Sequence, residues 1–378
     1  MKSVKIALLW PVGLRNFDSA TAIQRYKYLS EHFNLQVIYP KYSSVRSDLL
    51  NSPNINRVGP RRKSVVGYLL AAYRALRDFK PDIVMTQCNY PAVFGKLFAN
   101  AVKAKWVVDI WDHPLLAAEN YRDKNSTFMS LVHTFIGYLV LLSLKKADGV
   151  ISSIHPSALE GYVQADRIWD VPNGTLYDKL ERIRQAEVET DELHMSYIGD
   201  VTLSRGLKLM LETTSIISEF HPQIRLTLIG PTNASSKKWL DSNVANLKLE
   251  KNVCYHGRLP WRTALSLVAK STFCLLPFRN SIGLNYIYPI KVLEALSLGK
   301  VVISSNLKGI RRIISDGYNG VLVDSLDAKD WAHRILSLID APLERERLMK
   351  AAILTAKRYA WEKVNEKLAE GLLNLIER

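Results

Sequence analysis

The sequence predicts an α/β protein built from two doubly wound domains. The chain has 378 residues, which is enough for two domains that each bury a core of their own. Apolar runs bounded by Pro and Gly alternate with helical periods in both halves, and such alternation is typical of parallel sheets covered on both faces. The alternation restarts after a polar, charged stretch at residues 177–194, where we place the linker. The predicted domains are therefore residues 1–180 and 181–360.

The first half contains four strand-like runs separated by helical periods. The strands are expected at residues 4–10, 35–40, 82–87 and 105–110, and the helices at 19–33, 64–79 and 91–102. Ligands of parallel sheets bind beyond the carboxyl ends of the strands. The loop at 10–19, which contains Gly13, and the loop at 107–114 are therefore candidate sites. In the second loop, Asp112 and His113 either face a ligand or close a capped strand end.

The second half repeats this pattern and ends in helices. Strands are expected at residues 195–199, 225–230, 253–257 and 272–277, and the tail from 327 to 378 has the periodicity of three helices. The apolar run at 128–144 is interrupted by polar residues and is shorter than the ~20 residues of a spanning helix, so it predicts a buried helix.

Cysteine usage and the amino terminus indicate the compartment. Cys88, Cys254 and Cys274 are too few and too scattered for a disulfide framework or a metal site, so we expect reduced core residues. The apolar run at 4–10 is short and ends at Pro11, which fits a first buried strand better than a signal peptide. We expect a cytosolic protein.

The formal charge of +15 is concentrated near the amino terminus. Residues 2–105 hold seventeen Lys and Arg against five Asp and Glu, an excess of twelve. Such an excess indicates nucleic acid or an anionic membrane as a partner. No nucleic-acid-binding module accompanies it, so we expect no nucleic-acid partner.

The stretch from 277 to 306 carries the most specific chemistry. Pro289 suits the first turn of a helix, and Gly299 is a typical stop signal. Lys291 and Glu294 are three residues apart and share a face of the first two turns. A helix start attracts phosphate, and a carboxylate beside it accepts hydrogen bonds from ribose or sugar hydroxyls. The alternative is an ordinary αβ unit with a surface Lys–Glu pair.

This stretch resembles the donor-site motif of the retaining GT-B glycosyltransferases of glycosyltransferase family 4. The matching residues are Pro289, Lys291, Glu294, Ala295, Gly299, Lys300, Val302 and Ser304. The resemblance implies two Rossmann-like domains facing a central cleft, with the final helix, residues 361–378, crossing back onto the first domain. It also implies that a sugar leaves a nucleoside diphosphate with retention of configuration.

Other segments resemble further parts of that family. Gly199, Arg205 and Gly206 resemble the element whose two cations hold the donor diphosphate, whereas Asp200 stands where the family has Arg. The segment around Arg258 resembles the loop that lies against the nucleobase. The turn at Asn173 resembles a family segment that suits an interdomain crevice. Gly13 stands where the family usually has two glycines.

The first Glu of the fuller family motif is missing from this sequence. Its position falls on Tyr286 or, if the segment containing Gly283 is aligned instead, on Asn280. The lost carboxylate would contact sugar hydroxyls, so the donor sugar stays open.

The resemblance favours a glycosyltransferase that needs neither a metal nor a cofactor, with Arg205 and Lys291 stabilising the departing diphosphate. Two alternatives remain: a GT-B nucleotide-sugar epimerase, and a non-catalytic partner of another transferase.

The acceptor is expected to be a glycan or a lipid-linked molecule. Residues 57–80 combine the basic cluster Arg61, Arg62 and Lys63 with a helical period. This segment predicts peripheral binding to the anionic cytoplasmic face of the membrane. The alternative is a solvated helix whose apolar side covers the sheet.

Overall fold

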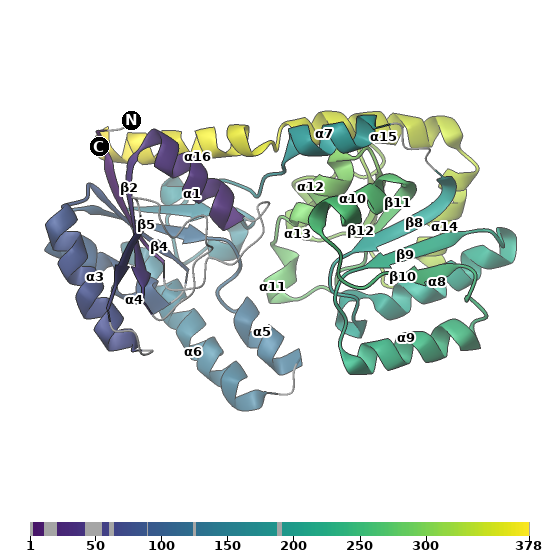
Figure 1. Cartoon of the computed structure of the whole chain (residues 1–378), viewed down its shortest axis with the longest axis horizontal. Coiled ribbons are helices and arrows are strands. Elements are labelled where there is room, and N and C mark those ends of the chain that lie inside the picture. Colours follow the sequence, from purple (N-terminus) through teal and green to yellow (C-terminus); the bar gives the residue numbers. More distant parts are fainter. Residues whose placement is uncertain are drawn as a thin grey trace. The chain divides into compact units, whose positions relative to one another are not determined.

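The computed structural model describes residues 3–10, 21–41, 55–59, 64–88, 90–123, 126–186 and 191–377. The chain forms two compact units. The first contains Met1–Asn173 and Trp361–Arg378, and the second contains Gly174–Ala360 (Figure 1). Gly13, Arg61, Arg62 and Lys63 lie outside the described residues.

The first unit is built on a parallel sheet with the strand order β3-β2-β1-β4-β5-β6-β7. Its strands are β1 (Lys5–Leu9), β2 (Asn34–Pro40), β3 (Ile55–Val58), β4 (Ile83–Gln87), β5 (Lys105–Ile110), β6 (Gly149–Ser152) and β7 (Ile168–Asp170). Strands β4 and β6 are buried along their whole length, and neither contains a charged residue. The order reverses beside β1, and ligands of such sheets bind at this switch point.

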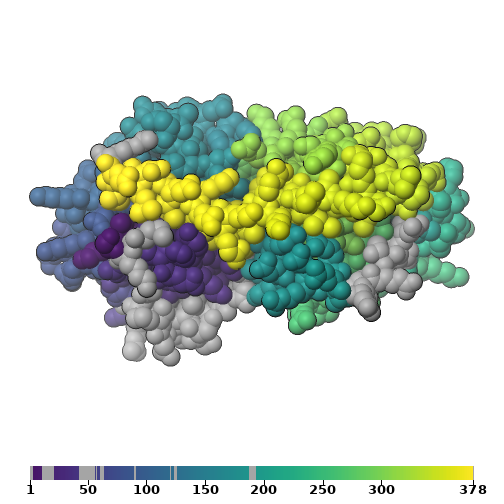
Figure 2. All heavy atoms as spheres, turned by 90° about the horizontal axis from the view of Figure 1, so that it is seen from above, coloured from purple at the N-terminus to yellow at the C-terminus, as the bar shows by residue number. Residues whose placement is uncertain are grey.

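Helices cover both faces of this sheet. They are α1 (Thr21–His32), α3 (Val65–Phe79), α4 (Tyr90–Ala101), α5 (Leu116–Asp123), α6 (Thr127–Ser143) and α16 (Trp361–Glu377), with short 3₁₀ turns η1 (Leu144–Lys146), η2 (Pro156–Leu159) and η3 (Ala165–Arg167). Helix α16 packs against α1, and Figure 2 shows it in yellow beside the purple amino-terminal segment. Helices α3, α4 and α6 lie on the other face of the sheet (Figure 1).

The second unit repeats this architecture with the strand order β10-β9-β8-β11-β12-β13, again all parallel. Its strands are β8 (Asp191–Ile198), β9 (Arg225–Ile229), β10 (Val253–Tyr255), β11 (Ser271–Leu276), β12 (Val301–Ser305) and β13 (Val321–Val323). Its helices are α7 (Tyr177–Gln185), α8 (Leu207–Phe220), α9 (Ala234–Asn246), α10 (Trp261–Ala269), α11 (Ile282–Asn285), α12 (Ile290–Ser297), α13 (Lys308–Arg311), α14 (Ala328–Ile339) and α15 (Pro342–Lys357), with one 3₁₀ turn, η4 (Leu203–Arg205).

The predicted α/β class with two Rossmann-like domains is confirmed. Among the strands missed by the sequence analysis, β3 and β7 have only four and three residues. Both lie at sheet edges, where one neighbouring strand is absent and a long apolar run is not required.

The linker predicted at residues 177–194 is wrong. Residues 177–185 form α7, whose Tyr177, Leu180 and Ile183 are buried within the second unit. Arg184 of the same helix donates a hydrogen bond of 2.8 Å to the Ser297 carbonyl at the end of α12. Charged residues on the outer side of an amphipathic helix thus gave this segment the composition of a linker.

The buried helix predicted at 128–144 is also wrong. Among the described residues, Thr127–Lys146 is long and apolar enough to cross a membrane by length and composition alone, yet only 28% of its most apolar 18-residue window is buried. The cysteine prediction holds for Cys274, which is buried, but fails for Cys254, which is exposed on the edge strand β10.

Candidate active site

The loops that follow β8, β9 and β10 are tied together at the carboxyl edge of the second sheet. The Gly199 N–H donates to the Ile229 carbonyl at 2.9 Å, and the Gly230 N–H donates to the Gly257 carbonyl at 2.8 Å. The Tyr255 hydroxyl adds a bond of 3.0 Å to the Gly230 carbonyl. Arg258 follows Gly257 directly and is exposed at this edge. These bonds give the strand ends a fixed backbone surface on which a ligand can rest.

Gly199 leaves room for the Lys291 side chain. Its φ of +147° is a conformation that other residues rarely adopt, and a Cβ at this position would overlap the Lys291 ammonium. The sequence match at Gly199 therefore has a steric reason: only glycine lets the lysine reach the end of β8.

Lys291 lies in the first turn of α12 and points between two aromatic rings. Its Nζ is 5.4 Å from the centroid of the Tyr197 ring and 5.5 Å from that of Phe278. Its pKa is lowered to about 8, mainly by burial and also by the nearby Arg205 charge, whereas Asp200 and Glu294 oppose this shift. An ammonium with so little water around it gains more from an anionic ligand than an exposed one does.

Arg205 is held next to Lys291 by the turn that begins α8. It ends η4, and Gly206 follows with a φ of +83°. A Cβ on Gly206 would overlap Pro277, so this turn packs directly on the chain leaving β11. The predicted pair of cations is thus brought together from two loops that are 86 residues apart.

Glu294 is one turn further along α12 and is almost completely buried. Burial raises the pKa of its carboxyl to about 7, while a hydrogen bond from Trp261 and the charge of Lys291 oppose that rise. The Trp261 Nε1–H donates to Oε1 of Glu294 at 2.7 Å. Because a carboxylate accepts several hydrogen bonds, this contact leaves capacity for hydroxyl donors.

Trp261 was missed by the sequence analysis. It begins α10, directly after the 256–260 segment compared with a nucleobase loop. A tryptophan at a helix start, following a loop already assigned to the site, was the available signal.

Asp200, the departure from the family pattern, is exposed beside the two cations. Its backbone carbonyl accepts a 3.0 Å bond from the Tyr197 hydroxyl. Its charge raises the pKa of Lys291, so the carboxylate lies within electrostatic range of the ammonium. A diphosphate at this position would meet two cations and one anion.

The segment from 280 to 286 follows β11 and contains the short helix α11. Asn280 is exposed, whereas Gly283 is buried inside α11, a short helix capped by Ser281. Tyr286 is half-buried, with the Lys308 Nζ 5.4 Å from its ring centroid. The Lys308 N–H also donates to Asn285 Oδ1 at 3.0 Å, which fixes the loop against α13.

The first unit places Asp112 and His113 at the carboxyl end of β5. Asp112 is exposed. His113 is buried, which lowers its pKa, and its Nδ1 accepts the Leu115 N–H at 3.2 Å. This bond assigns the neutral ring its proton at Nε2. The Nδ1 atom of His113 therefore stabilises the turn after β5, as the interpretation of a capped strand end predicted.

A buried ion pair beneath this loop was not predicted as a pair. Arg25 of α1 is paired with Asp109 at the end of β5, and it also donates to Ser153 Oγ at 2.5 Å. The Trp111 Nε1–H donates to the other Asp109 oxygen at 2.7 Å. Asn173, at the end of the first unit, accepts a 2.5 Å bond from the Thr21 hydroxyl. These contacts order the loops at the carboxyl edge of the first sheet.

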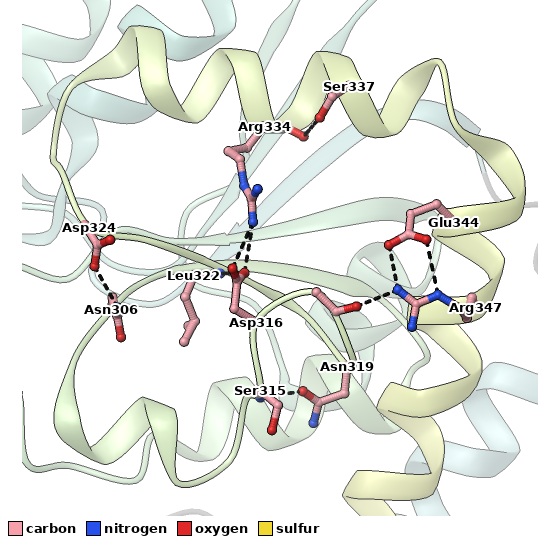
Figure 3. Close-up of polar contacts among 11 residues, drawn as sticks. Asn306, Ser315, Asp316, Asn319, Leu322, Asp324, Arg334, Ser337, Glu344 and Arg347 are labelled. Carbon is pink, nitrogen blue, oxygen red and sulfur yellow. Dashed lines mark hydrogen bonds and ion pairs between the residues drawn. The ribbon is translucent and has the colours of Figure 1, made fainter.

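Hydrogen bonds hold the loop after α13 against the neighbouring helices. Asp316 accepts hydrogen bonds from the Leu322 N–H at 2.8 Å and from Arg334 at 2.9 Å (Figure 3). Asn319 accepts the Ser315 N–H at 2.8 Å, and Arg347 donates to the Gly317 carbonyl (Figure 3). The turn at Asp316 and Gly317 is thus fixed against α14 and α15.

Over the described ranges, no group of three or more His, Cys, Asp or Glu side chains is placed to hold a metal ion. The polar groups gathered in the second unit are two cations, one buried carboxyl and one exposed carboxyl. This combination suits an anionic ligand that also carries hydroxyl groups.

Comparison with solved structures identifies the class of fold. HepE from Anabaena in complex with UDP superposes with a TM-score of 0.74 at 14% identity, over 98% of this chain and 100% of HepE. The apo form of the lipopolysaccharide outer core galactosyltransferase WaaB gives a TM-score of 0.69 at 16% identity, over 98% and 99% of the two chains. The chain has the GT-B fold of these glycosyltransferases.

The sequence similarity to a known family lies in the second half of the chain. Residues 178–355, nearly all of the second unit, match the family described as "Glycosyl transferases group 1". D-inositol 3-phosphate glycosyltransferase from Pseudarthrobacter chlorophenolicus is 27% identical over 186 residues, which are 48% of this chain and 42% of that protein. The enzyme of that name from Stackebrandtia nassauensis is 24% identical over 212 residues, 53% and 46% of the two chains. The chain thus spans less than half the length of these curated relatives.

Proposed function

We propose that this chain is a retaining glycosyltransferase that moves a sugar from a nucleoside-diphosphate sugar to a hydroxyl of a glycan or lipid-linked acceptor. The observation that carries the proposal is the grouping of Arg205, Lys291 and Glu294 around the start of α12. The match to glycosyl transferases group 1 covers all three residues, which supports assigning them to one ligand.

Each charged group has a distinct role in holding the donor. Arg205 and Lys291 bind the diphosphate, with the unpaired N–H groups at the start of α12 adding to their field. The Glu294 carboxylate accepts hydrogen bonds from ribose or sugar hydroxyls, and Trp261 fixes its orientation. Arg258 and its loop lie at the edge where the nucleobase would rest.

The reaction needs no protein nucleophile. The bond between the sugar C1 and the diphosphate oxygen breaks, and the acceptor oxygen forms its bond to C1 on the same face. The acceptor proton passes to the departing phosphate oxygen. Arg205 and Lys291 stabilise the negative charge that develops on the diphosphate, so their contribution is greatest in the transition state.

Asp112 and His113 are proposed to face the acceptor. Burial lowers the pKa of His113 and so favours the neutral ring, in which Nδ1 accepts the Leu115 N–H. A neutral imidazole here positions a hydroxyl rather than taking its proton.

The proposal is tested by a thermal-shift screen against UDP, GDP, ADP and their common sugars. A ligand that binds only the folded chain raises Tm by mass action. UDP is the first nucleotide to test, since HepE has been solved with UDP and with UDP-glucose. A shift with a nucleotide sugar, followed by transfer to an acceptor, supports the proposal. The absence of any shift favours a non-catalytic partner, and release of an epimer without transfer favours an epimerase.

A further inference from the structure

Exposed apolar side chains in the described part of the first unit gather on three helices. Each large apolar side chain that is exposed there belongs to α3, α4 or α6. They are Val65, Val66 and Leu70 of α3, Phe94 and Leu97 of α4, and Phe128, Leu131, Phe135, Tyr138 and Leu142 of α6. We call this set the apolar face. Isolated exposed apolar residues are common on proteins, but a contiguous set marks an interaction surface.

Helix α6 contributes half of the apolar face. Its exposed residues recur at spacings of three and four, so they form one stripe along the helix. Phe128 is 74% exposed and Phe135 is 66% exposed. No residue from 126 to 144 is Asp, Glu, Lys or Arg. The exposed side of this helix therefore offers water nothing but apolar and weakly polar groups.

The other two helices continue the apolar face beside α6. Helix α4 packs against both α6 and α3 (Figure 1). The rings of Tyr73 in α3 and Phe98 in α4 stack at a centroid distance of 6.4 Å, which fixes these two helices side by side. Val66 and Leu70 of α3 thus lie in the same layer as Phe94 and Leu97 of α4.

Exposed lysines follow the carboxyl-terminal ends of all three helices. Lys80 follows α3, Lys103 follows α4, and Lys145 and Lys146 follow α6; all four are exposed. Of the acids near this edge, Asp148 is paired with Lys96 at 2.7 Å, while Asp78 and Asp82 are exposed and Asp82 accepts the backbone N–H of Lys5 at 2.7 Å. The apolar face is therefore bordered at one end by positive charge.

Other arrangements of α6 fit the observations less well. The helix does not stand alone as a membrane span would, because its inner side packs on α4 and α5, with Gly137 against Pro114 and Leu115. A coiled-coil contact with a second copy would place charges beside the apolar stripe to set register. Residues 126–144 have none.

We propose that the apolar face inserts into the interfacial region of an anionic membrane, with Lys80, Lys103, Lys145 and Lys146 binding lipid headgroups. An apolar surface flanked by cations is the combination that binds a lipid interface. This places the contact on α3, α4 and α6 rather than on the cluster of Arg61, Arg62 and Lys63, which lies outside the described residues.

The position of the apolar face also suits a lipid-linked acceptor. In a parallel sheet the crossover helices begin near the carboxyl ends of the strands, so α6 begins on the side where β5 leads to Asp112 and His113. An acceptor held in the membrane would reach the carboxyl edge of the first sheet from the bilayer surface. The membrane proposal itself does not depend on the donor site.

The test is sedimentation of the full chain with vesicles of phosphatidylcholine containing phosphatidylglycerol, and with vesicles of phosphatidylcholine alone. The test variant is Leu131→Glu/Phe135→Glu, which changes side chains that are 65% and 66% exposed. The matched control is Phe220→Glu/Leu354→Glu in the second unit, where the side chains are 65% and 66% exposed. Both variants remove one Leu and one Phe and add two charges, so they differ only in location.

The expected result is that the wild type and the control sediment with anionic vesicles, more weakly as salt rises, and that the test variant partitions at least ~10-fold less. Far-UV circular dichroism and Tm establish that both variants are folded. Failure of the wild type to bind anionic vesicles overturns the proposal, as does equal binding of the test variant and the control. A dimer in sedimentation velocity that the test variant dissociates, without a change in vesicle binding, would assign the face to a second copy instead.

Discussion

The two units share a strand order but differ in where they place apolar and charged side chains. The second unit buries the Lys291 ammonium and the Glu294 carboxyl near the ends of its strands. Its described exposed large apolar residues are spread over η4, α8, α11, α15 and two loops. The first unit gathers such residues on three adjacent helices. Net charge does not separate the units, since formal charges are +8 for the first and +7 for the second.

Buried charges and exposed apolar surface indicate different roles for the two units. Buried charges cost free energy unless a ligand or partner compensates them, so the second unit carries the features of a binding site. Exposed apolar surface costs free energy unless something covers it, so the first unit carries the features of a docking surface. The comparison predicts that nucleotide affinity responds to changes in the second unit and membrane affinity to changes in the first.

The largest effect is expected at the two cations. Arg205→Ala and Lys291→Ala each remove a charge-assisted contact of about 1.5–3 kcal/mol, so kcat/KM should fall by roughly 10- to 150-fold for each. Because both side chains hold one diphosphate, the double variant should lose less than the product of the two single losses. Steady-state kinetics with the nucleotide sugar measures all three values.

A matched control for this experiment is Lys300→Met. Lys300 is a second buried lysine whose pKa burial lowers to about 8, but it lies beyond the other end of α12 and donates to the Ala269 carbonyl at 2.7 Å. Its loss should lower stability and leave KM for the donor unchanged. Strictly multiplicative losses at Arg205 and Lys291 would show that the two cations do not share the ligand. A rise in KM for Lys300→Met as large as that for Lys291→Ala would show that the effect of Lys291 does not come from contact with the donor.

The next largest effect is expected at Glu294, the proposed hydrogen-bond acceptor for hydroxyl groups of the donor. Glu294→Gln preserves size but replaces a carboxylate oxygen by an amide, so kcat/KM should fall at least ~10-fold, about 1.4 kcal/mol. The Trp261 contact survives if the amide oxygen faces the indole, and the fold should persist. Kinetics of Glu294→Gln beside the control Glu344→Gln, at a half-buried residue that pairs with Arg347 in α15, decides this point. Wild-type turnover of Glu294→Gln would remove Glu294 from the site.

A smaller, graded effect is expected from pH. Burial raises the Glu294 pKa to about 7, and the deprotonated form is the one that accepts hydroxyl hydrogen bonds. Nucleotide affinity should therefore fall as the pH drops below 7, approaching ~10-fold per unit if binding requires the carboxylate, and it should also fall above pH 8, where the Lys291 ammonium loses its proton. Calorimetric titration from pH 5.5 to 8.5 follows this change. A Glu294→Gln variant should lack the fall below pH 7; an identical fall in the variant would assign that titration to another group.

The smallest effect is expected from chelation. The proposed donor contacts use Arg205, Lys291 and backbone N–H groups, so EDTA should leave the rate of transfer unchanged. Assays with EDTA, Mg²⁺ and Mn²⁺ measure this. Activity that disappears with EDTA and returns with either ion would require a metal in the site.

Gly199, Lys291 and Glu294 were predicted because they match family motifs, and the structure places Lys291 against Gly199 and one turn before Glu294. Their role in binding a ligand stays a prediction. Trp261 was missed, since a hydrogen bond to a carboxylate 33 residues away has no local signature. The Arg25–Asp109 pair was missed for the same reason, with its partners 84 residues apart.

The fold was predicted where periodicity is strong and missed where burial depends on distant partners. The apolar sequence of α6 indicated a core helix, but composition cannot show which side of the helix the rest of the unit covers. Residues 177–185 resembled a linker, because the side chains that α7 buries are outnumbered by those it exposes. Short edge strands such as β7 carry too few residues for a pattern.

We propose above all that the second unit binds a nucleoside diphosphate through Arg205 and Lys291. Calorimetric titration of UDP, GDP and ADP into the wild type, Lys291→Ala, Lys300→Met and Leu131→Glu/Phe135→Glu tests it most directly. We expect that one of these nucleotides binds the wild type and that Lys291→Ala weakens its binding at least ~10-fold. The other two variants should bind it as the wild type does. Equal affinity in Lys291→Ala, or no binding of any of the three nucleotides, would contradict it.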